Sequence, residues 1–253
     1  MLHDIAVVWQ KYGLQILGGV GNTMLISIIG TVAGLLIGLF NGVIRTIPKP
    51  KNGFLRILLS VVNWIITAYV EVFRGTPMMV QAMIIYWGYA YANGGKTLNL
   101  ILSGIIIVSI NTGAYITEIV RGGIISIDKG QFEGAASIGM SHFQTMFYVV
   151  LPQVIRNILP SVSNEFVVNI KDTSVLNVIG VTELFFYAAS AAKNSYKMFA
   201  SYLIACAIYF VLTFTVTRLL RLLEKLLEGK NHYTVFGSQT SPSAEIHIVK
   251  EAE

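Results

Sequence analysis

The sequence predicts an all-α integral membrane protein with about five transmembrane helices, its N-terminus outside and its C-terminus in the cytoplasm. Of its 253 residues, 54% are hydrophobic and only 12% are charged, about half the charged share of a typical soluble domain. Several apolar runs reach about 20 residues, long enough to cross a bilayer as a helix. A loop with four basic and no acidic residues, at Arg45, Lys49, Lys51 and Arg56, follows the first run. Such loops stay in the cytoplasm, which places the N-terminus outside.

Residues 1–18 are expected to form a separate amphipathic helix at the membrane interface. Their apolar and aromatic side chains recur every three or four residues, at Leu2, Ile5, Trp9, Tyr12 and Ile16. Alternatively, this stretch simply begins the first span, which we place at residues 20–43 within a transmembrane region of residues 19–220. Glycines recur every fourth residue in that span, at Gly30, Gly34 and Gly38. They would permit close packing against another helix.

The second apolar stretch, residues 55–91, should be kinked or broken at Gly75 and Pro77. Just before the break, Glu71 and Arg74 are three residues apart and so fall on one helical face, where they can pair. Charged residues at membrane depth usually face a bundle interior or a cavity. A role in a solute path and a purely structural ion pair both remain open.

Two later spans carry polar residues. In the third, residues 98–120, Asn111, Tyr115 and Glu118 share one face, which either binds a neighbouring helix or lines a path. In the fourth, residues 162–180, an adjacent lysine and aspartate would cost several kcal/mol unless paired or hydrated. We therefore expect local unwinding near Asp172, and favour a cavity edge over a buried polar network for Lys171, Asp172, Thr173 and Ser174. The fifth span covers residues 198–216.

The stretch from Glu133 to Pro160 is the longest relatively polar segment between apolar spans. Apolar residues recur in this region at the spacing of a helix buried on one face, at Phe132, Ala136, Phe143, Phe147 and Val150. Together with the small residues, this spacing predicts a short helical hairpin at the membrane surface. The small residues would let a partner approach closely. The spacing equally permits a loop that packs only on its own protein.

The same stretch, EGAASIGM followed by LPQ and LP, resembles the EAA loop of permease subunits from binding-protein-dependent ABC importers. The likeness is to the polar amino-acid branch, of the histidine, glutamine and arginine permease type. YVEVFRGTPMMVQ and KDTSVLNVIGVTEL resemble two further signatures, and the three occur in order over residues 65–185. The resemblance implies the fold of a type I ABC importer permease, with a cytoplasmic coupling loop at residues 121–160.

In the family this loop docks into a groove on a separate ATPase subunit. The resemblance therefore implies coupling roles for Glu133, Gly134, Ala135 and Gly139. Gly134 departs from the alanine usual in the family, which should make the helix slightly less stable there. The substrate pathway is expected to involve Glu71, Arg74, Asn111, Tyr115, Glu118, Lys171, Asp172, Thr173 and Ser174. Of these, the acidic groups expected to be buried, Glu118 and Asp172, would suit an ammonium group.

The partners implied are an ABC ATPase dimer, a second permease subunit (the same chain or a paralogue), an extracytoplasmic amino-acid-binding protein and the amino acid. The location implied is the bacterial cell membrane, and no nucleic-acid partner is expected. We expect neither an enzyme nor a bound cofactor or metal in this chain, with ATP and magnesium held by the ATPase. Residues 92–97 end in GGKT but Ala90 replaces the first glycine of a phosphate-binding loop, and the four histidines lack metal-ligand spacing.

The alternative function is a stand-alone amino-acid transporter or channel driven by an ion gradient, with Glu118, Lys171 and Asp172 as its relay. Such carriers commonly show inverted repeats, and residues 20–120 and 120–220 show none. Residues 221–253 should form a cytoplasmic helix and a disordered tail without assigned function.

Overall fold

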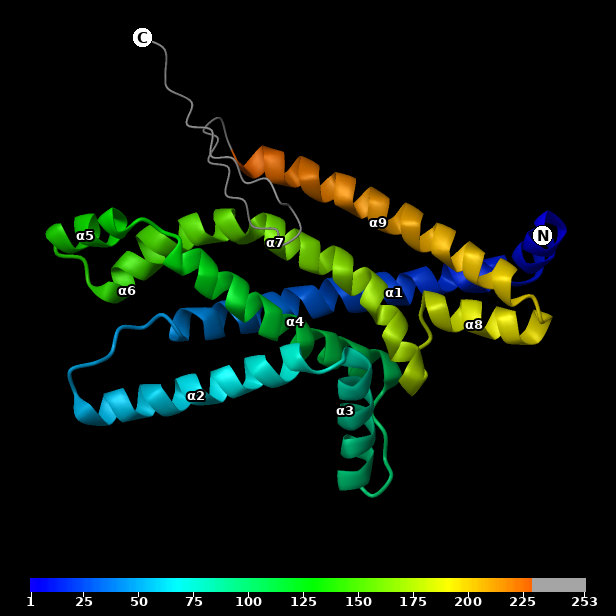
Figure 1. Ribbon diagram of the computed structural model, residues 1–253, viewed down its shortest axis with the longest axis horizontal. Helices are drawn as coiled ribbons and strands as arrows, with labels where there is room; N and C mark the ends of the chain where they lie inside the picture. Colours follow the sequence, from blue (N-terminus) through cyan, green and yellow to red (C-terminus); the bar gives the residue numbers. More distant parts are fainter. Residues whose placement is uncertain (229–253) are drawn as a thin grey trace, which may run out of the picture.

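The computed structural model describes the backbone of residues 1–228 and the side chains of residues 1–226, with no strand among them. The helices, shown in Figure 1, are α1 (Leu2–Ile44), α2 (Gly53–Gly75), α3 (Met78–Ala92), α4 (Leu100–Ile125), α5 (Lys129–Ser137), α6 (His142–Gln144), the π-helix η1 (Thr145–Val150), α7 (Leu151–Asp172), the 3₁₀-helix η2 (Thr173–Ile179), α8 (Leu184–Ser195) and α9 (Met198–Glu228). Four of them, α1, α2, α4 and α9, are long and apolar enough to span a membrane. A fifth span results if residues 142–179 and α8, bent by 54°, count as one. The predicted all-helical membrane fold is confirmed.

Helices α1 and α4 run parallel and form the most extensive helix contact of the bundle. Glycines on α1 lie directly against bulkier residues of α4, and a Cβ atom added to any of them would come within 2.8 Å of α4. The facing pairs are Gly30 with Val108, Gly34 with Thr112, Gly38 with Ile116, and Gly42 with Val120. The predicted small-residue packing is therefore real, and it extends one helical turn further than the sequence indicated.

The boundary expected near residue 18 is absent, because α1 continues without a break from Leu2 to Ile44. Val8 and Ile16 are fully buried in a cluster with residues of α8 and α9. Gly19 is pressed against the backbone of Glu183, where a Cβ atom would lie 2.8 Å away. These contacts hold the N-terminal turns as part of the bundle. The alternative, that this stretch begins the first span, is the one the structure supports.

The helix boundary expected at residue 221, near the C-terminus, is absent as well. Helix α9 runs unbroken through residue 221, so the helix expected at residue 221 is the continuation of the fifth span. The expected disordered tail lies beyond residue 228 and outside the described residues.

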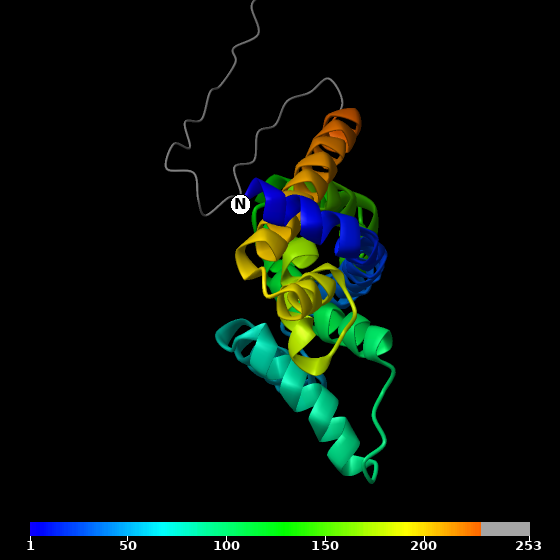
Figure 2. The ribbon, with the colours of Figure 1, turned by 90° about the vertical axis from the view of Figure 1, so that its right-hand side faces the viewer.

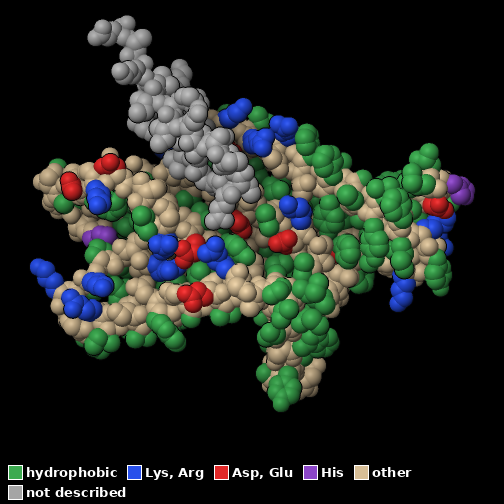
Figure 3. All heavy atoms as spheres, in the orientation of Figure 1, with side chains coloured by type: hydrophobic (Ala, Val, Ile, Leu, Met, Phe, Trp, Pro, Cys, Tyr) green, Lys and Arg blue, Asp and Glu red, His purple; other side chains and the backbone are tan. Residues whose placement is uncertain are grey.

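The predicted break after Arg74 is confirmed, since α2 ends at Gly75 and α3 begins at Met78. Gln81 holds the break together by donating from Nε2 to the carbonyl oxygens of Phe73 and Thr76, each at 2.9 Å. Beyond it, α3 projects away from the other helices (Figures 1 and 2). Hydrophobic side chains cover the visible face of α3, as Figure 3 shows.

Candidate functional site

The predicted coupling segment forms a short helical hairpin, α5 and α6, at one end of the bundle (Figure 1). Asp128 caps α5, its Oδ1 accepting from the Gly130 amide at 2.6 Å. The helix ends at Ser137, and the chain turns at Gly139, whose φ of +80° lies in the left-handed region that favours glycine. The amides of Met140 and Gly139 close this end by donating to the carbonyls of Ala135 and Ala136, at 3.1 and 3.0 Å.

A second capping arrangement starts α6. The Ser141 hydroxyl accepts from the Gln144 amide at 3.3 Å, and the Gln144 side chain accepts from the Ser141 amide at 2.8 Å. This reciprocal pair is a capping box, and it fixes the chain direction immediately after the Gly139 turn. Local hydrogen bonds thus fix the turn of the hairpin on both sides, at the C-terminal end of α5 and at the N-terminal end of α6.

One side of the hairpin is anchored in the protein and the other is free. Ala135 is buried, and Phe132 packs against a cluster that includes Met146 of η1. Glu133, Gly134 and Gly139 are exposed. Of the four predicted coupling residues, three therefore lie on the outer surface, and Ala135 helps to fix the helix beneath them.

Two exposed aromatic residues extend this surface. The rings of Phe143 and Phe147 stack with centroids 6.1 Å apart, and the side chains are 74% and 56% exposed. Their helical spacing had indicated a buried face, which is wrong for this pair. An exposed apolar pair on the same hairpin segment is typical of a surface that a partner covers.

Glu118, predicted for the substrate pathway, lies at the end of α4 that leads into the hairpin, with both carboxylate oxygens engaged. Oε1 pairs with Arg45, and Oε2 accepts from Nε of Arg121 at 3.0 Å. This triad ties the end of α1 to the end of α4. The arrangement favours a structural role over ammonium binding.

Glu71 and Arg74 do not form the expected ion pair; among the described residues Glu71 has none. Arg74 instead lies over the ring of Tyr115, with its guanidinium carbon 5.3 Å from the centroid. Cation–π contact with a residue of α4 replaces the local pairing, and Glu71 is left exposed. Of the predicted pathway residues, Arg74 of α2 and Tyr115 of α4 are thus brought together, whereas Glu71 is not part of this contact.

Asn111 and Gln81 form a polar joint where α2, α3 and α4 meet. Asn111 Nδ2 donates to Gln81 Oε1 at 2.9 Å, and both side chains are buried. Gln81 was not singled out from the sequence, although a glutamine four residues after a helix-breaking proline is placed to satisfy the freed carbonyls. Asn111 therefore secures the break between α2 and α3 rather than facing a cavity.

The α-helix ends at Asp172, but the expected unwinding does not occur, because the chain continues directly as the more tightly wound 3₁₀-helix η2 from Thr173. Lys171 and Asp172 fall on different faces of α7 because neighbouring residues on a helix point about 100° apart. Asp172 and Glu165 are seven residues apart and share a face. Glu165, which was not among the predicted site residues, lies within electrostatic range of both Asp172 and Arg74.

The other residues of this cluster have different environments. Thr173 is fully buried and donates to the Ile170 carbonyl at 2.9 Å, whereas Ser174 is half-buried. Asn169 joins three helices, donating to the Thr31 hydroxyl at 2.7 Å and accepting from the Thr112 hydroxyl at 3.1 Å. A buried polar network therefore exists in this region, but it is formed by Asn169 with Thr31 and Thr112 and not by the four residues for which it was considered.

Glu183 is a fully buried carboxylate that sequence analysis passed over. It accepts from the amides of Phe185 and Phe186 at 2.8 and 2.6 Å and from the Tyr209 hydroxyl at 2.7 Å. A glutamate directly before an apolar helical run is the available signal, because it can cap the helix. Within the described residues, no three His, Cys, Asp or Glu side chains are grouped to hold a metal ion.

Comparison with known proteins gives consistent matches. Residues 56–229 match the family described as the binding-protein-dependent transport system inner membrane component. The glutamine transport system permease protein of Escherichia coli strain K12 is 33% identical over 228 residues, covering 90% of this chain and 99% of that protein. The L-cystine transport system permease protein of Bacillus subtilis strain 168 is 34% identical over 223 residues, covering 88% and 90%.

Two solved structures share the fold. One is an amino acid ABC transporter crystallised with histidines, 35% identical, with a TM-score of 0.73 over 87% of this chain and 97% of that one. The other is the methionine transporter MetNI in an inward-facing conformation, with a TM-score of 0.69 over 85% and 96% but only 16% identity. The family match spans more than half of the chain, and the relatives align over nearly their whole lengths. The chain therefore belongs to the family of inner membrane components of binding-protein-dependent transport systems.

Proposed function

We propose that this chain is the transmembrane permease subunit of an ABC importer that moves polar L-amino acids across the bacterial cell membrane. A separate ATPase dimer would dock on the α5–α6 hairpin through Glu133, Gly134, Gly139 and the exposed Phe143 and Phe147. The observation that carries this proposal is the hairpin itself, rigidly capped and anchored on one side and open on the other. A second permease subunit, the same chain or a paralogue, and an extracytoplasmic amino-acid-binding protein would complete the importer.

Coupling would follow from the connections of the hairpin. Only residues 126–128 separate α4 from α5, and α6 passes through η1 directly into α7. A displacement of the docked hairpin when the ATPases close on ATP would therefore move the ends of α4 and α7 together. Such coupling needs two helix arrangements whose balance is shifted both by ATP and by the loaded binding protein.

The substrate path is proposed to run between the Arg74–Tyr115 pair and the face of α7 that carries Glu165 and Asp172, because Glu165 lies within electrostatic range of Arg74. An α-amino acid brings a carboxylate and an ammonium group, which Arg74 and the two acidic residues complement in charge. Glu118 is left out because its oxygens are occupied by Arg45 and Arg121. The ion-gradient carrier considered as the alternative loses one of its three relay groups for the same reason.

Coupling is tested by reconstituting the chain with a candidate ATPase and amino-acid-binding protein in proteoliposomes. Glu133→Lys should abolish both ATPase association and solute-stimulated ATP hydrolysis, because it reverses an exposed charge on the docking face. Its exposure predicts unchanged subunit folding, which thermal unfolding in detergent would check. Gln10→Lys is the control. Gln10 is exposed near the N-terminus of α1, far along the chain from the hairpin, so the variant should leave coupling intact. Normal coupling by Glu133→Lys would contradict the docking proposal.

The path is tested separately in the same proteoliposomes. Asp172→Asn should lower amino-acid uptake at least tenfold, since it removes a charge proposed to hold the ammonium group. ATPase association and basal ATP hydrolysis should not change, because Asp172 is far along α7 from the hairpin. Uptake at the wild-type rate would exclude Asp172 from the path without affecting the docking proposal.

A further inference from the structure

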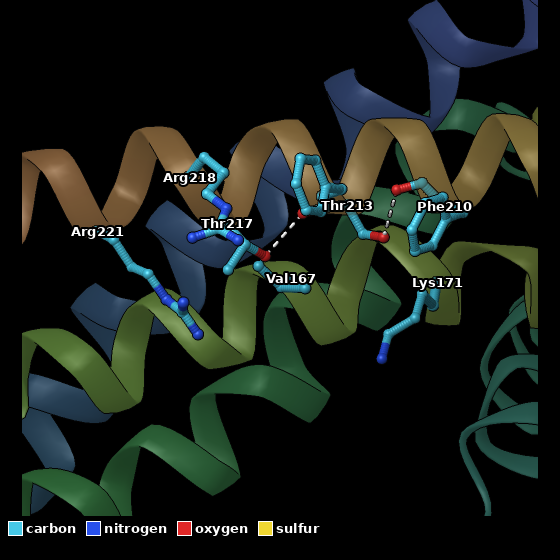
Figure 4. A pocket seen from close by; sticks show the side chains of 8 residues that line it. Val167, Lys171, Phe210, Thr213, Thr217, Arg218 and Arg221 are labelled. Carbon is cyan, nitrogen blue, oxygen red and sulfur yellow. Dashed lines mark hydrogen bonds between the residues drawn. The ribbon is translucent and has the colours of Figure 1, made fainter.

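A positively charged groove lies between α7 and α9, outside the substrate path proposed above. Lys171 of α7 and Arg218 and Arg221 of α9 line it together with threonine and aromatic residues, as Figure 4 shows, and its volume is ≈ 220 Å³. All three cationic side chains are exposed. The groove lies on the face of α7 that carries Lys171 and Val167, whereas Asp172 and Glu165 are on another face.

Among the described residues, the cations that line this groove outnumber the carboxylates near them, of which Asp172 interacts electrostatically with Lys171. Up to residue 226, none of the three cations forms an ion pair, and no acidic residue lines the groove. One acidic residue, Glu224, lines an adjoining groove that shares Arg221. Even with Glu224 counted, the two grooves together carry a net positive charge.

The threonines do not compete for an anion. The hydroxyl of Thr213 donates to the Tyr209 carbonyl at 2.8 Å, and that of Thr217 donates to the Thr213 carbonyl at 2.7 Å. The hydrogen-bond donors still available in the groove therefore belong to the lysine and the two arginines. A ligand that they bind should be an anion.

The surroundings of the groove indicate the kind of anion. The apolar stretch of α9 ends just before Arg218, so Arg218 and Arg221 lie at the edge of the membrane-spanning part. Phe210 and Phe214, 67% and 49% exposed, border the groove on the apolar side, and Arg218 lies 4.9 Å from the ring centroid of Phe214. Basic pockets between transmembrane helices near the membrane surface bind anionic lipid headgroups.

We propose that this groove binds the phosphate of an anionic phospholipid. Arg218 and Arg221 hold the phosphate at the membrane edge, and Lys171 reaches it from α7 with its long aliphatic stem along the apolar wall. The acyl chains lie along Phe210 and Phe214. The lipid thereby bridges α7, which carries Asp172, and α9, and it stabilises their contact from outside the solute path.

The proposal is tested on the purified full-length chain by native mass spectrometry after exchange into lipid nanodiscs. Phosphatidylglycerol, phosphatidylcholine with the same acyl chains, and inorganic phosphate are compared as ligands. We expect phosphatidylglycerol to bind preferentially. The double variant Arg218→Gln/Arg221→Gln should bind it roughly 25-fold more weakly, about fivefold for each lost cation.

Controls separate this site from general charge effects. Lys49→Gln/Arg56→Gln removes two exposed cations outside the groove and should leave binding unchanged. Arg218→Lys/Arg221→Lys keeps the charge and should retain most of the binding, which excludes misfolding as the cause of a loss. Equal binding of phosphatidylcholine, displacement of the lipid by equimolar inorganic phosphate, or undiminished binding by the glutamine double variant would overturn the proposal. A change of oligomeric state without a change in lipid binding would also overturn it, because the groove would then be an interface between protein chains.

Discussion

The pair α1–α4 and the arm α2–α3 are built from similarly apolar helices but behave in opposite ways. In their most apolar stretches, 56% of α4 is buried within the chain, compared with 11% of α2. Helix α1 meets α4 through a stripe of glycines, whereas α2 presents large side chains such as Trp64, which is 72% exposed. The difference shows that hydropathy identifies a membrane helix, while small residues decide which helices touch.

The physical reason lies in the solvent. Lipid tails are as apolar as leucine, so exposing an apolar face of α2 to lipid costs little, and burying one gains little. Close backbone approach gains dispersion contacts, and only residues without a bulky side chain allow it. The contrast between the two regions can therefore be tested by exchanging side-chain size, charge pairing and polarity in each.

The largest effect is expected from Gly38→Ala in α1. The added Cβ would lie 2.5 Å from Ile116 Cγ2 and 2.9 Å from the Ile116 carbonyl carbon, so the two helices must move apart. Such overpacking should lower the free energy of unfolding by about 3 kcal/mol. Reversible unfolding in detergent micelles would measure the change.

Two matched glycines serve as controls for this prediction. Gly21 in α1 and Gly88 in α3 have open space where a Cβ would be placed. Gly21→Ala and Gly88→Ala should be neutral or stabilising by up to about 1 kcal/mol, since alanine favours a helix. If Gly88→Ala lowered the free energy of unfolding as much as Gly38→Ala, the arm α2–α3 would be packed as tightly as the pair α1–α4.

An intermediate effect is expected from Glu118→Gln in α4. The variant leaves Arg45 and Arg121 close together without their shared counterion, and the Glu118 and Arg45 side chains are only 21% and 16% exposed. Stability should fall by about 2 kcal/mol, less than for a fully buried pair because water still reaches the site. Added salt should reduce the loss.

Glu71→Gln in α2 is the corresponding control. Glu71 is exposed and forms no ion pair with any residue that the structure describes, so its charge should not matter for folding. Thermal unfolding of the two variants at low and high salt compares them directly. A salt-dependent loss in Glu71→Gln equal to that in Glu118→Gln would remove the distinction between the two regions.

The glycines of α1 and the two glutamates show how far sequence reasoning extends. The glycine spacing of α1 predicted close packing correctly, because a helical repeat is a local property. Glu71 and Arg74 satisfied the local rule for an ion pair, yet Arg74 found Tyr115 on α4 instead. The partner of Glu118 is Arg45, 73 residues away in the chain, and no spacing rule reaches that far.

For the coupling hairpin, too, the sequence predicted some features correctly and others wrongly. The resemblance pointed to Gly139, and the left-handed φ of +80° at this residue supplies the physical reason for a glycine, which spacing could not. Helical spacing also assigned Phe143 and Phe147 to a buried face, whereas both are exposed. Hydrophobic periodicity gives the face of a helix but not what covers it.

The smallest effect is expected from exchanging one asparagine in each region for leucine. Asn169→Leu removes the two hydrogen bonds that join α7 to Thr31 and Thr112, and stability should fall by about 1 kcal/mol. On α2, the buried Oδ1 of Asn63 has no hydrogen-bond partner among the described residues. Asn63→Leu removes this unsatisfied group and should be neutral or stabilising by about 1 kcal/mol. Opposite signs in the two unfolding measurements would confirm that α1, α4 and α7 are held by internal contacts. A loss in Asn63→Leu would mean instead that α2 has a polar partner within the isolated subunit, and that the arm belongs to the same packed unit.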